Sequence, residues 1–119
     1  MPNSARNISC FDKSEIKKLF KQARRLLKLP GLDILVHPAL KESGRILVIT
    51  PAKIGNAVRR NRVRRQLKAL FYTEKYNQKP FDCIIIIKKG GIEYSFEQLK
   101  SALIQAYSKI PQAFHADAQ

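Results

Sequence analysis

The densest concentration of chemically capable side chains lies in residues 53–65, which read KIGNAVRRNRVRR. This stretch holds five arginines and two asparagines, and no Asp or Glu occurs between Glu42 and Glu74. Guanidinium groups grip phosphate oxygens with paired hydrogen bonds, and an unneutralised cluster of them attracts polyanions. The segment therefore predicts a phosphate-binding element. An ordinary solvated helix would intersperse Glu among its cations.

The helical periodicity of this region separates an apolar side from a cationic one. At about 100° per residue, one side of a helix carries Val63, Leu67, Leu70 and Phe71. The remaining circumference carries Asn61, Arg62, Arg64, Arg65 and Lys68. One helix thus has a face to bury and a cationic face left for a partner.

The start of this helix has the features of an anion site. Asn56 is a suitable N-cap for a helix that begins at Ala57, and Gly55 allows an unusual φ or a close backbone approach to a ligand. Arg59 and Arg60 then fall in the first turn, where the helix dipole disfavours cations unless an anion lies beside them. Free backbone donors and arginines would there point at the same phosphate.

Groups that could hydrolyse RNA directly are not evident in the sequence. Metal-dependent hydrolysis needs clustered carboxylates, and metal-free acid–base cleavage needs paired histidines. The nine acidic residues are dispersed, while His37 falls in a predicted hairpin loop and His115 in the tail, both expected to face solvent. The sequence therefore predicts a binding protein with no catalytic residue and no metal ligands of its own.

A first helix is predicted from Asp12 up to Pro30-Gly31. Asp12 and Glu15 form a capping box, and Phe11 and Ile16 have the spacing of a hydrophobic staple. The apolar stripe of this helix consists of Ile16, Leu19, Phe20, Ala23 and Leu27. Lysines and arginines occupy its other sides.

The remaining elements predict an α+β fold. Leu32–Val36 and Arg45–Thr50 are predicted strands joined by a loop over residues 37–44. Phe81–Lys88 is rich in isoleucine without polar alternation, which indicates an inner strand covered on both faces. A last helix follows a second capping box, Ser95 with Gln98, and ends at Pro111.

Length and composition are those of one small, strongly basic domain. The 119 residues carry a formal charge of +14 and are enough to bury a core without cross-links. Cys10 and Cys83 lack partners at metal-ligand spacing, so a reduced, cytoplasmic chain is expected. No apolar run could span a bilayer. We expect a single domain over residues 1–119, with an ordered core of about 6–110 and a frayed tail at 111–119.

The arginine segment resembles the signature of the bacterial ribonuclease P protein subunit, a Lys-x-Gly-Asn-Ala-Val run followed by an Arg-Asn-Arg helix. The matching positions are Lys53, Gly55, Asn56, Ala57, Val58, Arg60, Asn61, Arg62 and Arg65. The resemblance extends more loosely over roughly residues 6–108. It departs at Thr50-Pro51-Ala52-Lys53, where the family commonly has Ser-Lys-Lys, at Ile16, often an aromatic, and at Ala23, frequently a glycine.

The resemblance implies a two-layer sandwich in the order α-β-β-β-α-β-α, with a central four-stranded sheet. It also implies a short third strand near Pro51–Lys53 and a left-handed βαβ crossover through the arginine helix. Physics alone would favour the opposite hand, since nearly all parallel crossovers are right-handed.

The resemblance also implies a function. In that family the RNA subunit, with bound Mg²⁺, removes the 5′ leader of precursor tRNA, and the protein assists with substrate and metal affinity. This chain would bind the catalytic RNA as a monomer in a one-to-one complex. The RNA-binding residues would be Lys53, Asn56, Arg59, Arg60, Asn61, Arg62, Arg64, Arg65 and Lys68.

A second surface would bind the leader in a cleft between the first helix and the sheet. Its candidate residues are Ile16, Lys17, Phe20 and Lys21, because single strands favour apolar or aromatic platforms flanked by cations. The alternative for Phe20 is a core position, since an apolar stripe at helical spacing usually packs inside the protein.

Other functional classes fit less well. A ribosome-associated or RNA-assembly protein with no link to tRNA processing would share the size and charge. Common RNA modules are disfavoured because neither an aromatic RNP strand nor a GxxG loop is present. A helix-turn-helix protein would need a helix where residues 45–50 predict a strand. A membrane-surface role lacks a suitable amphipathic segment.

Overall fold

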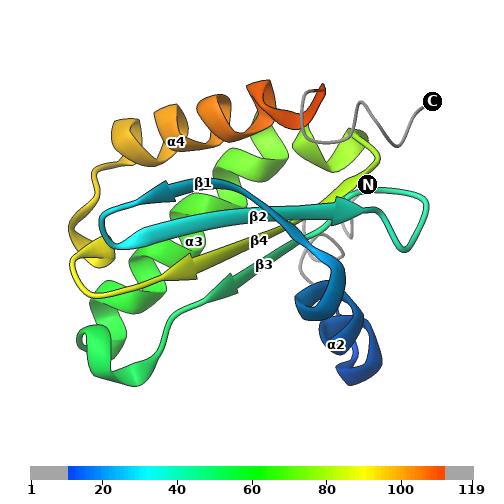
Figure 1. Ribbon diagram of the computed structural model, residues 1–119. Helices are drawn as coiled ribbons and strands as arrows, with labels where there is room; N and C mark the ends of the chain where they lie inside the picture. Colours follow the sequence, from blue (N-terminus) through cyan, green and yellow to red (C-terminus); the bar gives the residue numbers. More distant parts are fainter. Residues whose placement is uncertain (1–10, 112–119) are drawn as a thin grey trace.

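The computed structural model describes residues 11–111, which form three α-helices and one four-stranded sheet (Figure 1). The helices are α2 (Lys13–Gln22), α3 (Ala57–Thr73) and α4 (Phe96–Ser108). The strands are β1 (Arg24–Leu29), β2 (Leu32–Pro38), β3 (Ile46–Ile49) and β4 (Phe81–Ile87). Three short 3₁₀ turns complete the fold: η1 (Ala52–Ile54), η2 (Tyr76–Gln78) and η3 (Gly91–Glu93). Within residues 11–111, no helix combines the length and apolar character needed to cross a membrane.

The strand order is β1-β2-β4-β3. Strand β2 pairs antiparallel with β1 and with β4, whereas β3 pairs parallel with β4. Helix α3 connects these two parallel strands, so the predicted α-β-β-β-α-β-α order and the mixed four-stranded sheet are confirmed. The left hand of that connection stays a prediction from the family. Strand β4 lies between two neighbours and is buried along most of its length, as its run of isoleucines predicts.

The extent of the first helix was predicted wrongly. Helix α2 ends at Gln22, and the predicted remainder up to Pro30 forms strand β1 instead. Pro30 and Gly31 make a two-residue turn, with Gly31 at φ 82°, and lead directly into β2. Strand pairing with β2 overrides the helical periodicity of this segment. As a strand, the segment buries both Leu26 and Leu27.

The connection between the next two strands was also misread. Strands β2 and β3 are not neighbours, because β4 lies between them, so residues 39–45 do not close a hairpin. His37 belongs to β2 and is buried, which contradicts its predicted place in a solvent-facing loop. The strand expected near Pro51–Lys53 is absent there, since that segment is η1 and Pro51 has no N–H for a sheet ladder.

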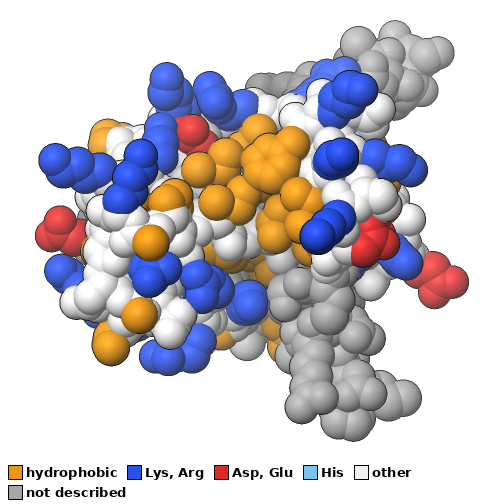
Figure 2. Space-filling view, turned by 90° about the horizontal axis from the view of Figure 1, so that it is seen from below, with side chains coloured by type: hydrophobic (Ala, Val, Ile, Leu, Met, Phe, Trp, Pro, Cys, Tyr) orange, Lys and Arg blue, Asp and Glu red, His pale blue; other side chains and the backbone are white. Residues whose placement is uncertain are grey.

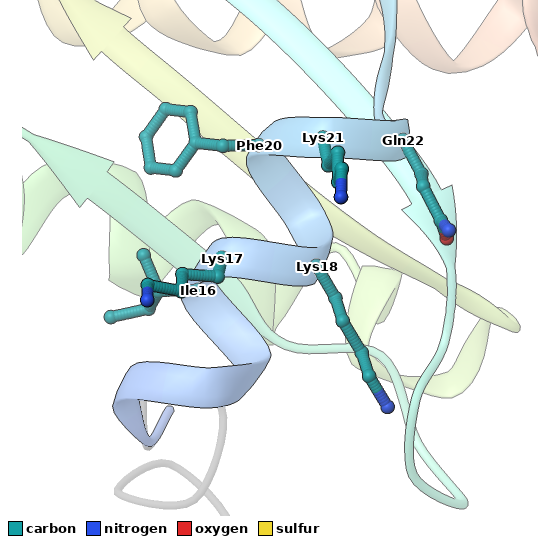
Figure 3. A pocket seen from close by; sticks show the side chains of 6 residues that line it. All are labelled: Ile16, Lys17, Lys18, Phe20, Lys21 and Gln22. Atoms are coloured by element: carbon teal, nitrogen blue, oxygen red, sulfur yellow. The ribbon is translucent and has the colours of Figure 1, made fainter.

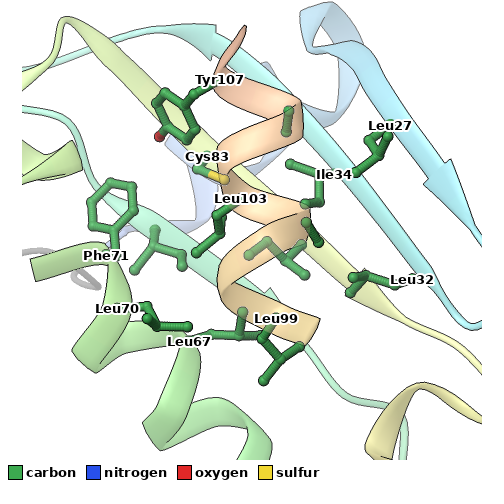
Figure 4. Close-up of a cluster of buried hydrophobic side chains, with 14 of the residues drawn as sticks. Leu27, Leu32, Ile34, Leu67, Leu70, Phe71, Cys83, Leu99, Leu103 and Tyr107 are labelled. Atoms are coloured by element: carbon green, nitrogen blue, oxygen red, sulfur yellow. The ribbon is translucent and has the colours of Figure 1, made fainter. Parts of the chain in front are cut away.

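The main core lies between the sheet and the pair α3 and α4 (Figure 4). Helix α3 contributes the four predicted residues Val63, Leu67, Leu70 and Phe71. Helix α4 contributes Leu99, Ala102, Leu103, Ala106 and Tyr107. The predicted capping boxes at the starts of α2 and α4 are both formed. Burial of these faces leaves the other side of α3 for the arginines.

Helix α2 packs on the opposite face of the sheet, where β2 ends and β3 begins (Figure 1). Leu19 of α2 and Ile84 of β4 are fully buried there, outside the main core. At this site the buried guanidinium of Arg45 donates to both carboxylate oxygens of Glu15, at 2.8 and 3.1 Å. Arg45 also lies 3.7 Å from the buried carboxylate of Asp82. These contacts fasten the start of α2 to the sheet.

Two further contacts complete the attachment of α2. The ring of Phe11 stacks 4.2 Å from the guanidinium carbon of Arg45. At the other end of α2, Nε2 of His37 lies 3.0 Å from Oε1 of Gln22, and Nδ1 lies 2.6 Å from the carbonyl oxygen of Pro38. The helix is therefore held at both ends and by Leu19 between them.

The ion cluster perturbs the carboxyl groups in opposite directions. The hydrogen bonds from Arg45 lower the pKa of Glu15 to about 2. Burial raises the pKa of Asp82 above its ordinary value. The backbone N–H groups of Leu40 and Arg45 and the Arg45 guanidinium stabilise the ionised carboxylate and lower this pKa, but their effect is smaller than that of burial. The cluster therefore depends on Glu15 remaining ionised.

The lowered pKa of Glu15 predicts a specific loss of stability in acid. A carboxyl group whose pKa is lower in the folded chain stabilises the fold above its unfolded pKa of about 4.5, and this contribution is lost as the pH falls towards about 2. Urea unfolding of the natural protein and of Glu15→Gln should therefore give free energies that differ at pH 6 and converge by pH 2. A pH-independent difference would contradict the assignment.

Candidate nucleic-acid interface

The first candidate surface is built on the start of α3. The side-chain oxygen of Asn56 accepts a hydrogen bond from the backbone N–H of Arg59 at 2.9 Å, which confirms the predicted N-cap. Arg59 and Arg60 lie in the first turn, and no acidic residue accompanies them there. The Asn56 side chain thus satisfies one of the free backbone N–H groups at the start of α3. The arginines add their charge to the partial positive charge at this end of the helix.

Gly55 does not have the unusual φ that was predicted as one of two possibilities, and the close approach of its backbone to a ligand stays a prediction. Its φ of 166° is extended backbone, which any residue can adopt. A Cβ atom at this position would lie 2.3 Å from Cδ1 of Ile92, a buried residue of η3. The loop before α3 therefore lies close to η3, and a side chain at position 55 would displace the end of the Ile92 side chain.

Three arginines of α3 are engaged in holding this loop and η3. Arg60 donates from Nε to the carbonyl oxygen of Gly55 at 3.1 Å, and Arg62 donates to the carbonyl oxygen of Ile92 at 3.2 Å. Arg64 donates to the hydroxyl oxygen of Thr50 and, at 2.8 Å, to Oδ1 of Asn61. These contacts fix the guanidinium groups in place and leave part of each donor set for a ligand.

The other cations of the segment have no such engagement. Within residues 11–111, the side chains of Lys53, Arg59, Arg65 and Lys68 make no hydrogen bond or ion pair. A shallow hollow on the outer side of α3 is lined by Asn61, Arg64, Arg65 and Lys68. The structure thus brings the nine residues predicted for RNA binding onto α3 and the loop before it, with free cations beside fixed ones. Such an array can bind several phosphates at once.

The second candidate surface is on α2. Leu19 points into the protein, but Phe20 is 48% exposed and Ile16 is half-buried, so the core alternative for Phe20 is wrong. A hollow beside the helix is lined by Ile16, Lys17, Lys18, Phe20, Lys21 and Gln22. In Figure 3, Ile16 and Phe20 project from the same side of α2, with Lys17 beside Ile16, while Lys18 and Gln22 project from another side.

The sheet continues this apolar surface beyond α2. Leu35 and Leu47 flank Ile84 in register, and Ile49 flanks Ile86, so these side chains share the face that α2 only partly covers. Apart from the fully buried Ile84, they are half-buried. The space-filling view from below, the side on which α2 lies, shows hydrophobic side chains gathered between Lys and Arg side chains (Figure 2).

The sequence predicted a cleft between the first helix and the sheet, but it did not identify the sheet residues that continue the apolar surface of α2. The run of isoleucines in β4 predicted a strand covered on both faces of the sheet. On one of these faces, helix α2 covers only one end of the strand (Figure 1). Nor were Arg45 and Asp82 recognised as the anchor of α2. The available signal was an acidic residue, Asp82, at the start of a strand that is otherwise buried and apolar.

The next question is whether residues 11–111 offer a metal site or a reactive thiol. Within this range, no set of three or more His, Cys, Asp or Glu side chains is placed to hold a metal ion. His37 is engaged with α2, and His115 and Cys10 lie outside the described residues. Cys83 is buried, and burial raises its thiol pKa to about 12.

Comparison with solved structures shows a shared fold. The RNase P protein from *Thermotoga maritima* superposes with a TM-score of 0.72 at 20% identity, covering 86% of this chain and 96% of that one. The *Staphylococcus aureus* RNase P protein also gives a TM-score of 0.72, at 17% identity, covering 85% of this chain and 93% of that one. At this level of identity the likeness concerns the fold alone.

Sequence comparison is more specific. A ribonuclease P protein component of *Bacillus velezensis* is 33% identical over 95 residues, covering 80% of this chain and 82% of that protein. One from *Borrelia hermsii* is 41% identical over 93 residues, covering 75% and 81%. The family model for ribonuclease P matches residues 6–111. Since that match spans nearly the whole chain, this protein belongs to the ribonuclease P protein family.

Proposed function

We propose that this chain is the RNA-binding subunit of a ribonuclease P, acting in the cytoplasm as a monomer bound to one catalytic RNA. The holoenzyme would remove the 5′ leader of precursor tRNA by endonucleolytic cleavage. The observation that carries the proposal is the acid-free outer face of α3, where Arg59 and Arg65 are free beside arginines already fixed by the protein. Family membership directs this binding face towards tRNA processing.

In this proposal the cations of α3 have two roles. Arg60 and Arg62 hold the loop before α3 and η3 through carbonyl oxygens, so the docking surface is formed before RNA arrives. Arg59, Arg65 and Lys68 are free to bind phosphates of the catalytic RNA. Preformed placement lowers the ordering cost of binding, because fewer long side chains must be immobilised in the complex.

The leader would lie in the groove between α2 and the open face of the sheet. Phe20 offers an exposed ring on which a base can stack, and Ile16 extends that apolar surface. Lys17 and Lys21 on the same helix would neutralise leader phosphates. Arg45 and Leu19 keep α2 in position. The apolar surface formed by Phe20 and Ile16 is therefore held in place for the single-stranded leader.

Hydrolysis itself is assigned to the RNA subunit and to Mg²⁺ held mainly by that RNA. A metal ion can activate water and stabilise the charge that develops on the scissile phosphate. The protein would raise the affinity for precursor tRNA and position it, because its two surfaces bind phosphate and unpaired bases without supplying an acid–base pair.

The function is tested by reconstitution. The purified protein with Mg²⁺ is expected to leave precursor tRNA intact, and addition of the cognate catalytic RNA should give cleavage at the mature 5′ end. RNA that copurifies with the protein should include that catalytic RNA when sequenced. Copurification of ribosomal RNA alone, with no stimulation of cleavage, would favour the ribosome-associated or assembly protein instead.

A second prediction concerns the free cations of α3. With four phosphates bound by Lys53, Arg59, Arg65 and Lys68, the affinity for the catalytic RNA should fall with salt on a log–log slope of about −3 to −4. Arg59→Ala combined with Arg65→Ala should make that slope shallower by about 2 and leave the melting temperature nearly unchanged. Filter binding across a salt series measures the slope. An unchanged slope would remove these two residues from the interface.

A third prediction concerns Phe20. Loss of a stacking aromatic weakens single-strand binding by about 1 to 3 kcal/mol per base, so Phe20→Ala should lower the affinity for precursor tRNA by that amount. The affinity for the catalytic RNA should be nearly kept. Leu19→Ala is the buried counterpart and should instead destabilise the fold by about 2 to 5 kcal/mol. Equal loss of both RNA affinities in Phe20→Ala would argue against a separate leader site.

A further inference from the structure

A third hollow, a pocket, lies at the far end of α3 from its capped N-terminus. It is open, has a volume of about 360 Å³ and is lined by Tyr72, Thr73, Lys75, Asn77 and Gln78. Tyr72 is 39% exposed, whereas the neighbouring Phe71 on the same helix is fully buried. Neither the arginine cluster nor the groove beside α2 includes any of these residues.

The pocket continues the line of free cations along α3. At about 100° per residue, Arg65, Lys68 and Tyr72 fall within about 60° of one another on the helix circumference. From Arg65 to Tyr72 the helix rises about 10 Å. Arg65 and Lys68 line the hollow that ends one turn before Tyr72. A polyanion that follows the outer face of α3 therefore arrives at this pocket.

The lining residues have the chemistry that recognises an unpaired nucleotide. A tyrosine ring provides a stacking surface for a base, and amide side chains can both donate and accept hydrogen bonds at a base edge. No acidic residue occurs in α3, and the carboxylate of Glu74, which follows it, lies 3.9 Å from the ammonium group of Lys100. The pocket is therefore open to a phosphate as well as to a base.

Lys75 stands where helices usually place a glycine. It follows the C-cap of α3 with φ 61° and ψ 27°, and among the described residues it is the one non-glycine residue with a positive φ. Glycine would adopt this conformation without steric strain. A lysine is found there instead, and it lines the pocket, where a nucleotide phosphate would need a cation.

We propose that this pocket binds an unpaired nucleotide of the same catalytic RNA that docks along α3. The base stacks on Tyr72, Asn77 and Gln78 bind its edge, and Lys75 binds its phosphate. The site rests on the proposed function, since it extends that docking surface from the start of the helix to its end. It adds a contact that depends on an extruded base, whereas the arginines bind the phosphate backbone.

The test compares four variants for affinity to the catalytic RNA. Tyr72→Ala should weaken binding by about 5- to 100-fold, the loss expected for one stacked base, whereas Tyr72→Phe keeps the ring and should bind nearly as the natural protein does. Phe96→Ala is the matched control, because Phe96 is 40% exposed on α4, away from this line, and should have no effect. Arg65→Ala reports on the docking surface independently.

The outcomes separate the pocket from the proposed function. Weak binding by Arg65→Ala with normal binding by Tyr72→Ala would overturn the pocket and keep the docking surface. Normal binding by both would overturn the docking surface as well. A Tyr72→Ala loss seen only with precursor tRNA would overturn the assignment to the catalytic RNA.

Lys75→Gly provides a readout that a purely structural lysine would not give. Glycine relieves the left-handed strain, so the melting temperature should stay equal or rise, while the affinity for the catalytic RNA should fall. Circular dichroism and filter binding on the same samples measure the two quantities. A stabilised variant with full affinity would overturn the role of Lys75 in the pocket.

Discussion

The arrangement of this protein depends on the buried guanidinium of Arg45. It binds Glu15 of α2, approaches the buried Asp82 at the start of β4 and stacks on Phe11. A buried charge is costly unless it is paired, so this cluster stabilises the observed placement of α2 against the sheet. Held there, α2 covers one end of the sheet and leaves Leu35 and its neighbours half-buried.

The arginine helix shows how one residue type can serve structure and binding together. A guanidinium group has five donors, so a single contact to a carbonyl oxygen fixes its position without exhausting it. Arg60 and Arg62 use such contacts to join α3 to the loop and turn beside it. Arg59 and Arg65 remain free on the same helix. The fixed arginines make the surface rigid, and the free ones give it unsatisfied donors.

The strand order connects the two candidate surfaces. Strand β3 begins beside Arg45, where α2 is anchored, and ends beside Thr50, whose hydroxyl oxygen accepts from Arg64 of α3. The groove floor formed by Leu47 and Ile49 therefore runs between the α2 platform and the loop that precedes α3. A bound RNA complex that engages both surfaces would cross this short strand.

Features that depend on neighbours along the chain could be predicted before the structure was known. The caps at Asp12, Asn56 and Ser95 follow from local hydrogen bonds, and the division of α3 into apolar and cationic sides follows from helical periodicity. Tertiary structure decided the rest. Residues 24–29 became a strand because β2 was there to pair with, and Phe20 stayed exposed because Arg45 holds α2 in one position. Partners that are distant in sequence made those choices, so no local pattern could reveal them.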